Sequence, residues 1–164
     1  MEKQKLNPQI AEQFAKNIFE KLPLEKDREF NKIHAKSLIG AALILAGDQK
    51  IDLELIIIAS WLHDLGKIVE MHNHAQHSIA IIKNEGFEIS KELEDCILNH
   101  GNKGNPICQE AKLIQIADKA CIIHPEILEM LVNFSLKKSK EEKTKDLEFI
   151  KKLMSDAVEL LTKY

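Results

Sequence analysis

The sequence predicts an all-α protein, a single compact helical bundle of about six to eight helices. Apolar residues recur at three- and four-residue spacing along most of the chain, and no segment alternates β-branched with polar residues as a half-buried strand does. Residues that begin or end helices, chiefly Pro, Gly, Asn and Ser, separate these apolar stretches. The 164 residues suffice for one domain with a substantial core, so residues 1–164 are expected to form a single unit.

The first two helices are expected from their terminal residues. Asn7 caps the first helix, Pro8 occupies its first turn, and Pro23 ends it. The second runs from about Lys26 to Ala46 and ends at Gly47. A single apolar face of this second helix, with His34 on or beside it, is expected to contain Phe30, Ile33, Ser37, Gly40, Ala41 and Ile44.

The next three helices occupy the middle of the chain. Asp52 can cap a third helix that extends through Trp61 or beyond, and this helix is apolar nearly all round, as a buried central helix is. Gly66 is expected to end it. The histidine-rich segment MHNHAQHS leads into a fourth helix that stops near Gly86, and Ser90 caps a fifth.

The carboxyl-terminal part is expected to be helical as well. Pro106 starts a sixth helix and Pro125 a seventh. From about Lys140 to Leu161, apolar residues recur at helical spacing and form one face of a last helix. We expect residues 126–164 to pack against the body of the protein, and the last helix makes a homodimer possible.

The charge pattern gives no strong indication of nucleic-acid binding. The net charge is −3, so no basic field covers the whole surface. The lysines between residues 137 and 145 are interleaved with Glu141, Glu142 and Asp146, which is typical of a solvated helix face.

The cysteines and the apolar runs predict a cytoplasmic protein. The longest apolar runs have about ten residues, well short of the roughly 20 that cross a membrane. The amino-terminal segment lacks the long apolar core of a signal peptide. Cys96, Cys108 and Cys121 are odd in number and lack close pairs, as expected of reduced thiols rather than disulfides.

The stretch ASWLHDLGK places His63 and Asp64 side by side at the end of a strongly apolar run. A buried carboxylate costs several kcal/mol unless it is paired or bound to a metal. Asp118 raises the same question, because LIQIADKACII is otherwise nearly apolar. Imidazole and carboxylate together suit iron, manganese, cobalt, nickel or zinc, so we expect a divalent transition metal.

Single members of this set have simpler explanations when each is taken alone. His34 could be an interface residue of an amphipathic helix, and His100 could be a cation at a helix carboxyl terminus. Asp118 could pair with Lys119.

The order of these residues resembles the HD-domain superfamily of metal-dependent phosphohydrolases. HDLGK is similar to the motif of its HDIG-type members, and the resemblance covers about Asp27 to Pro125. It implies a bundle of the HD-domain type. It also implies that the first metal is held by His34, His63, Asp64 and Asp118.

The resemblance also implies a second metal. HAQHSIAIIKNEG resembles the family segment in which a histidine precedes a small residue by four positions, which selects His74 and Ser78. CILNHG resembles the segment that supplies a further histidine and selects His100. Asp64 would then bridge both ions.

Three histidines compete for one of these ligand positions. Only nine residues separate Asp64 from His74, so the connecting loop is short. His77 lies one helical turn beyond His74, and His72 precedes the helix. We favour His74, then His77, then His72, and either of the last two could contact a substrate phosphate instead.

The resemblance implies a phosphohydrolase that cleaves a phosphomonoester or phosphodiester of a small molecule, with a nucleotide favoured, by a metal-activated water. Asp64 would orient this water. Lys67 could reach the phosphate, although a solvated lysine at a helix end explains it equally well. Two alternatives stay open: a di-iron oxygenase of the HD-domain type, and a ligand-binding HD domain without catalysis.

Overall fold

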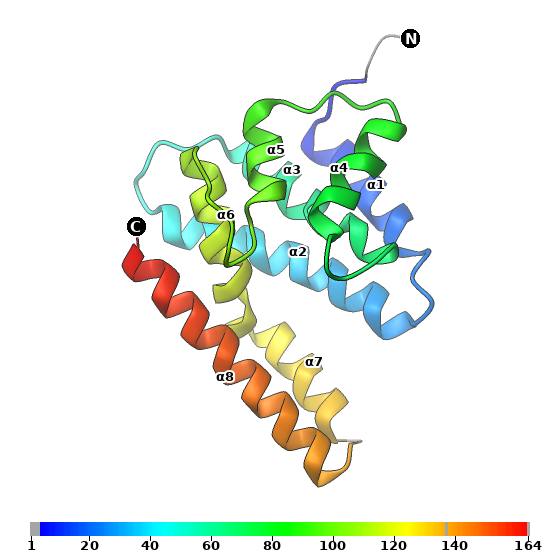
Figure 1. Ribbon diagram of the computed structural model, residues 1–164, viewed down its shortest axis with the longest axis vertical. Helices are drawn as coiled ribbons and strands as arrows, with labels where there is room; N and C mark the ends of the chain where they lie inside the picture. Colours follow the sequence, from blue (N-terminus) through cyan, green and yellow to red (C-terminus); the bar gives the residue numbers. More distant parts are fainter. Residues whose placement is uncertain (1–3, 137, 164) are drawn as a thin grey trace.

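The computed structural model describes residues 4–136 and 138–163. Within these residues the chain forms eight α-helices, two short 3-10 helices and no strand, which confirms the all-α prediction (Figure 1). The elements in chain order are α1 (Pro8–Phe19), α2 (Glu25–Ala46), α3 (Leu53–Leu62), η1 (Leu65–Ile68), α4 (His74–Asn84), α5 (Lys91–Leu98), α6 (Gln109–Ala120), η2 (Cys121–Ile123), α7 (Pro125–Leu136) and α8 (Lys140–Lys163).

Helix α3 lies at the centre of the bundle, as its apolar sequence predicts. It contacts α1, α2, α5 and α6, and Ile56, Ala59 and Leu62 have no exposed surface. Helices α7 and α8 form an antiparallel hairpin along one side of the molecule (Figure 1). The hairpin joins the body through contacts of α7 with α2 and of α8 with α6.

Side-chain caps fix the start of three helices where the sequence predicts them. The carboxamide oxygen of Asn7 accepts a hydrogen bond from the backbone N–H of Ile10 at 2.9 Å. The Asp52 carboxylate and the Ser90 hydroxyl act in the same way at α3 and α5. Each cap satisfies a backbone donor that would otherwise lack a partner in the first turn.

One predicted helix end and one predicted helix start are wrong, and both lie close to residues of the candidate site. Helix α3 ends at Leu62 rather than at Gly66, and the chain continues into η1. Helix α6 starts at Gln109 rather than at Pro106. The Asp95 carboxylate accepts hydrogen bonds from the backbone N–H groups of Ile107 and Cys108, both at 2.8 Å, and so holds this segment outside the helix.

The buried face of α2 also differs from the one expected from its sequence. Ile44 is 82% exposed, whereas the buried row contains Ala35, Leu38, Ala42 and Ala46. These mostly small side chains let the α2 backbone approach α3 and α6 closely. His34 lies on this buried row and therefore points into the bundle.

A close contact between η1 and α4 depends on Gly66. A Cβ atom at this position would lie 1.9 Å from the carbonyl oxygen of His74. The Gly66 N–H donates a hydrogen bond to the Ser78 hydroxyl at 2.8 Å. That hydroxyl lies 2.8 Å from the carbonyl oxygens of both His63 and His74, to which its proton can be donated. Ser78 thus joins the end of α3 to η1 and α4.

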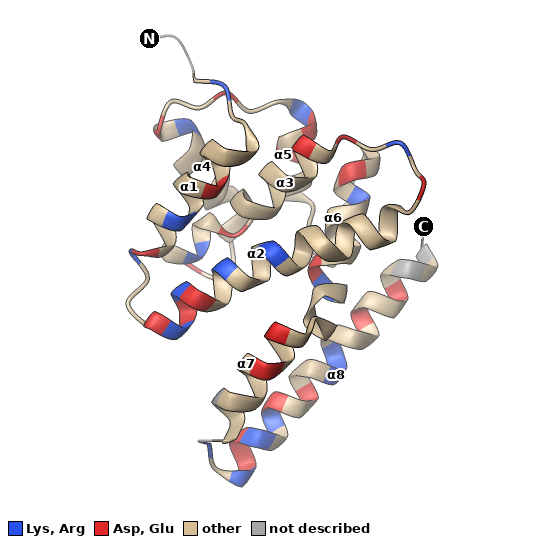
Figure 2. Ribbon diagram, turned by 180° about the vertical axis from the view of Figure 1, so that it is seen from behind, with Lys and Arg blue, Asp and Glu red and all other residues tan. Residues whose placement is uncertain are grey.

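The surface carries both signs of charge on the carboxyl-terminal hairpin. Figure 2 shows acidic and basic residues interleaved along α8. Two ion pairs join these residues, Lys145 with Glu141 at 2.8 Å and Lys138 with Asp146 at 2.9 Å. Lys137, which belongs to the same run of lysines, lies outside the described residues. In the part of the chain that the structure describes, no helix is both long and apolar enough to cross a membrane.

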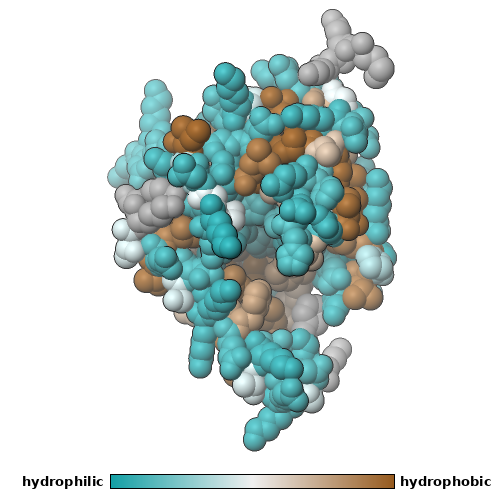
Figure 3. Space-filling view, in the orientation of Figure 1, coloured by the Kyte–Doolittle hydropathy of each residue, from teal (hydrophilic) through white to brown (hydrophobic). Residues whose placement is uncertain are grey.

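On the face shown in Figure 3, the surface is hollowed between the α7–α8 hairpin and the rest of the molecule, and apolar residues lie in the hollow.

The close approach at Gly66 predicts a strong response to one added methyl group. We expect Gly66→Ala to lower the free energy of unfolding by about 2 kcal/mol, because His74 must move to make room. Urea denaturation measures this change. Gly40→Ala is the control: it lies in α2 with open space around its Cβ position, so it should stabilise by about 0.5–1 kcal/mol. Equal effects of the two substitutions would contradict the prediction.

Candidate metal centre

Six ionisable side chains that are distant in sequence meet at the centre of the bundle. Five of them are at most 9% exposed, and that of His74 is 21% exposed. They come from α2, the end of α3, the start of η1, the start of α4, the loop after α5, and α6. The structure thus brings together all six predicted ligands, namely His34, His63, Asp64, His74, His100 and Asp118.

Four of these side chains direct one atom each toward a common point. The atoms are Nε2 of His34, Nε2 of His63, Oδ2 of Asp64 and Oδ1 of Asp118, and the distances of each imidazole to the other three atoms lie between 3.0 and 3.5 Å. An ion 2.0–2.2 Å from four tetrahedral ligand atoms would separate those atoms by about 3.3–3.6 Å. The spacing therefore suits a transition-metal ion.

The second oxygen of Asp64 faces two further histidines. Its Oδ1 lies 3.3 Å from Nε2 of His74 and 4.0 Å from Nε2 of His100. These two nitrogens lie 2.9 Å apart. Asp64 thus divides its two oxygens between two groups of ligand atoms, the arrangement that a carboxylate bridging two ions requires.

The hydrogen bonds of the imidazoles determine which nitrogen is free to bind a cation. His63, His74 and His100 each place Nδ1 at 2.7–3.0 Å from the backbone carbonyl oxygen three residues earlier. A carbonyl only accepts, so Nδ1 carries the proton and Nε2 of the neutral ring presents a lone pair. This second hydrogen bond is typical of metal-binding histidines. When both Nδ1 atoms are protonated, the Nε2 atoms of His74 and His100, 2.9 Å apart, can be bridged by a further proton or by a metal cation.

His34 is oriented by a thiol that sequence reasoning did not include in the site. Its Nδ1 lies 3.4 Å from Sγ of Cys121, and that thiol donates to the backbone carbonyl of Asp118 at 3.3 Å. Burial raises the pKa of Cys121, so it stays protonated. The ring of His34 also stacks on Phe30 with centroids 5.8 Å apart.

The two carboxylates dominate the electrostatics of the site. Burial alone would raise the pKa of Asp64, but His63 and Lys67 hold it well below its usual range. Lys119 acts in the same way on the pKa of Asp118. Burial disfavours the charged form of His63, yet the two carboxylates outweigh this and raise its pKa to about 9. The site thus attracts positive charge strongly.

One histidine of the site behaves differently. Burial and the neighbouring His63 lower the pKa of His100 to about 4, so its imidazole stays neutral at pH 7. A neutral imidazole is the form that binds a metal.

Each of these carboxylates also contacts a lysine, and for Asp64 the oxygen involved is Oδ2, which faces His34 and His63 as well. Nζ of Lys67 contacts Oδ2 of Asp64, and Nζ of Lys119 contacts Oδ2 of Asp118. Both lysines line a cavity above the ligand cluster. The sequence suggested Lys119 only as an ion-pair partner, because adjacency to Asp118 does not reveal that its ammonium faces a cavity.

The other two candidate histidines lie outside the cluster. Nε2 of His77 lies 3.2 Å from a carboxylate oxygen of Glu70, and His72 is exposed. Of the three competing histidines, His74 is the one whose imidazole lies beside Asp64.

Gln115 holds the loop that carries His100, a role that the sequence does not reveal. Its side-chain amide donates to the carbonyl oxygens of Asn99, Gly101 and Gly104 at 3.1, 2.7 and 3.1 Å. Gln115 has no exposed surface and belongs to α6, the helix of Asp118. The same helix therefore positions ligands on both sides of the cluster.

The ligand cluster forms the floor of a cavity of about 300 Å³. Its remaining lining comes largely from apolar side chains, two of them on α7 and two on α8. These apolar residues are Phe30, Met71, Ile122, Ile127, Leu131, Phe149 and Leu153.

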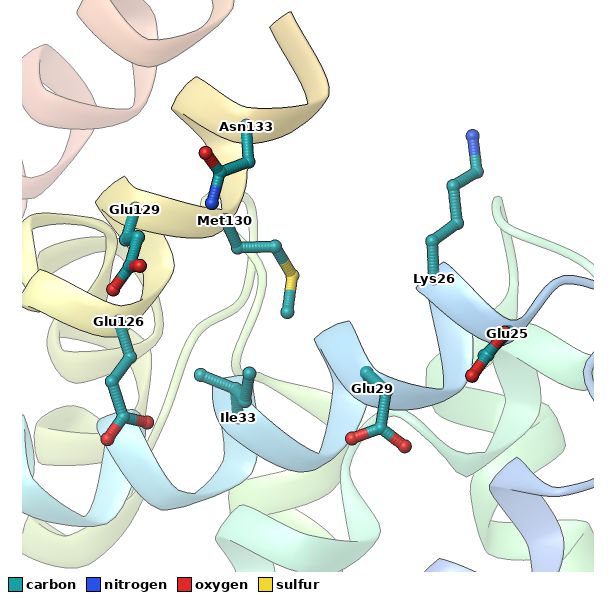
Figure 4. A pocket seen from close by; sticks show the side chains of 8 residues that line it. All are labelled: Glu25, Lys26, Glu29, Ile33, Glu126, Glu129, Met130 and Asn133. Atoms are coloured by element: carbon teal, nitrogen blue, oxygen red, sulfur yellow. The ribbon is translucent and has the colours of Figure 1, made fainter.

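A second, larger cavity lies between α2 and α7 (Figure 4). Its volume is about 490 Å³, and its lining includes Glu25, Glu29, Glu126 and Glu129. Four carboxylates repel an anionic ligand, and none of them belongs to the clusters of described residues that could hold a metal. We therefore place the candidate site in the smaller cavity.

The fold and the site define an all-helical protein with a buried His/Asp cluster that could hold a metal ion. Residues 9–121 match the family model described as HD domain, and the chain belongs to the HD domain family. The match begins earlier than the resemblance quoted from the sequence, so it includes α1, and it ends before α7. No curated protein and no solved structure matches the chain.

Members of this family are generally hydrolases and bind divalent metals.

The geometry predicts that metal binding depends on the paired residues. We expect purified protein to carry a divalent transition metal, and His63→Ala or Asp64→Ala to remove most of it, because each loss opens the first group of ligands. Elemental analysis of the purified variants measures this. His72→Ala, which changes an exposed histidine, is the matched control and should retain the metal. Equal metal in all four proteins would show that the cluster binds none.

The raised pKa of His63 predicts a pH dependence of metal affinity. The pKa of His63 in the metal-free protein is raised to about 9, so at lower pH its imidazole carries a second proton. A metal ion that binds to His63 must displace this proton. The affinity should therefore rise with pH between 6 and 8, about tenfold per unit for one displaced proton. Titration of chelator-treated protein with Mn²⁺ at several pH values tests this, and an affinity that is constant across that range would contradict it.

Proposed function

We propose that this protein is a metal-dependent phosphohydrolase that cleaves a phosphate ester of a small molecule. One observation carries the proposal: two groups of ligand atoms share Asp64 at the floor of a cavity, and the ammonium groups of Lys67 and Lys119 flank them. The ligand atoms of such a floor can bind cations, and the two ammonium groups can bind an anion that enters the cavity.

The donor set fits a pair of divalent transition-metal ions. His34, His63, Asp64 and Asp118 would hold the first, and Asp64, His74 and His100 the second. When bound, such ions lower the pKa of water and offset the charge on phosphoryl oxygens. Nitrogen and carboxylate ligands suit Fe, Mn, Co, Ni and Zn alike.

The side chains around the centre have distinct tasks in this proposal. Asp64 orients the attacking water through a carboxylate oxygen, which can accept its hydrogen bond. The ammonium groups of Lys67 and Lys119 contact the carboxylates of Asp64 and Asp118 in the free protein. When substrate binds, they turn from these carboxylates to the phosphoryl oxygens. The apolar walls exclude bulk water, which strengthens both interactions.

The substrate class follows from the family and the charge of the cavity. A phosphomonoester or phosphodiester suits a floor that carries two lysines, and a nucleotide is the example that the family resemblance favours. The ammonium groups also favour phosphate-ester hydrolysis over the di-iron oxygenase alternative, because activation of oxygen needs no anion-binding lysines. A non-catalytic binding domain would not need to retain all six ligands.

Two further expectations stay predictions. The cytoplasmic location rests on Cys96, Cys108 and Cys121, all of which are free thiols. The homodimer rests on α8, where the apolar side chains of Leu147 and Met154 are about half exposed in the single chain.

The proposal predicts hydrolysis that depends on metal and on the flanking lysines. With added Mn²⁺ we expect turnover of p-nitrophenyl phosphate or bis-p-nitrophenyl phosphate, and loss of turnover on chelation. Lys119→Met should lower kcat/KM at least tenfold, because one charged contact to phosphate is lost. The release of p-nitrophenol measures both effects.

The control for this experiment is Lys83→Met, which removes a surface lysine on α4 that pairs with Glu94. It should leave turnover unchanged. If the metal-loaded protein hydrolyses neither compound nor any member of a panel of nucleotides and sugar phosphates, the proposed function is wrong. Spectroscopy of a reduced, oxygen-exposed iron form then tests the oxygenase.

A further inference from the structure

We propose that the α7–α8 hairpin selects the substrate, and that the substrate is a phosphomonoester whose organic group is apolar and about the size of one aromatic ring. This inference rests on the proposed function and narrows its substrate class. The hairpin lies beyond residues 9–121, the part of the chain that matches the HD domain model.

The lining of the site cavity divides into two chemically distinct parts. All of its charged and imidazole side chains belong to the floor, where five of the six candidate ligands (all but His63) and the two lysines lie. The part of the lining that the hairpin supplies is apolar. It consists of Ile127 and Leu131 from α7 and Phe149 and Leu153 from α8. A ligand with its phosphate on the floor therefore places its organic group against the hairpin.

The aromatic ring of Phe149 has the properties of a ligand contact. It lines the cavity and yet is 56% exposed, although an exposed phenyl ring has much to gain from being covered. Ile122 and Ile127, by contrast, are almost fully buried and form a fixed base to the apolar part. A ring that enters the cavity would cover Phe149 and release water from both surfaces.

The apolar part offers little to a polar organic group. Among the described residues that line it, no side chain carries an oxygen or nitrogen atom, and Met71 contributes only a thioether. Sugar hydroxyls placed there would lose their hydrogen bonds to water without replacement. An aryl or arylalkyl group has no such cost, so the cavity should prefer it to a sugar.

The charge of the floor favours a monoester over a diester. Asp64 and Asp118 are balanced by Lys67 and Lys119, so each divalent ion that binds adds two uncompensated positive charges. A phosphomonoester carries a charge of about −1.5 to −2 at pH 7, whereas a diester carries one negative charge. The volume of about 300 Å³ lies at the lower end of ligand cavities, which leaves room for one ring beside the phosphate.

Esters of two primary alcohols test this selection without a difference in leaving-group chemistry. We expect the Mn²⁺-loaded protein to hydrolyse benzyl phosphate with a kcat/KM at least tenfold higher than that for ribose 5-phosphate. Phe149→Ala should lower the value for benzyl phosphate about three- to tenfold, lower the value for ribose 5-phosphate much less, and leave the metal content unchanged. Val158→Ala, which changes a similarly exposed side chain of α8 outside the cavity, is the control.

The inference is overturned if ribose 5-phosphate is hydrolysed as well as benzyl phosphate, or if Phe149→Ala affects both esters equally. If no ester is hydrolysed, the proposed function is wrong. The preference of the cavity for an apolar group is then tested by ligand binding alone. Calorimetry with Mn²⁺-loaded protein should show that benzylphosphonate binds at least tenfold more tightly than methylphosphonate, and that Phe149→Ala removes this difference. Equal affinities of the two phosphonates would refute an apolar subsite.

Discussion

The burial of two carboxylates, Asp64 and Asp118, is the constraint on which the rest of this structure depends. Each would cost several kcal/mol in an apolar interior if it had no partner. Their partners come from three directions: His34 on α2, His63 at the end of α3, and a lysine beside each carboxylate. The helices must therefore converge at one point, and the bundle is organised around charge as much as around apolar contacts.

Local hydrogen bonds orient the individual ligand side chains, and long-range hydrogen bonds fix the positions of these side chains relative to one another. His63, His74 and His100 each bond to a carbonyl three residues earlier, so a single turn of backbone fixes each ring and its protonated nitrogen. The relative positions of these turns need contacts between elements. Ser78 supplies one by joining α3, η1 and α4, and Gln115 supplies another by holding the loop after α5. Uncharged, fully buried side chains thus position the charged ones.

The sequence predicts what depends on neighbouring residues and misses what depends on distant ones. Helix starts with side-chain caps could be predicted because caps are local. A metal at His63, Asp64 and Asp118 could be predicted because ionisable residues in apolar runs demand partners, whereas His34, His74 and His100 are assigned as ligands through the family resemblance. The start of α6 could not, because the Asp95 carboxylate that delays it lies twelve residues before Ile107. The buried face of α2 depends on how closely α3 and α6 approach. Lys119, near the end of α6, and Cys121, at the start of η2, join the site only through the way this part of the chain meets the cavity.

The boundary of the family match coincides with a change in the chemistry of the cavity. The residues up to Cys121 supply every charged group of the floor, whereas the apolar wall depends on Ile127 and the other hairpin residues beyond it. A reactive floor tolerates little variation, because seven ligand atoms must lie within a few tenths of an ångström of the spacing that an ion requires. An apolar wall only has to match the shape of what it covers. Substrate selection can therefore change through α7 and α8 while the floor stays intact, because the hairpin supplies side chains to the apolar wall and none of the six candidate ligands.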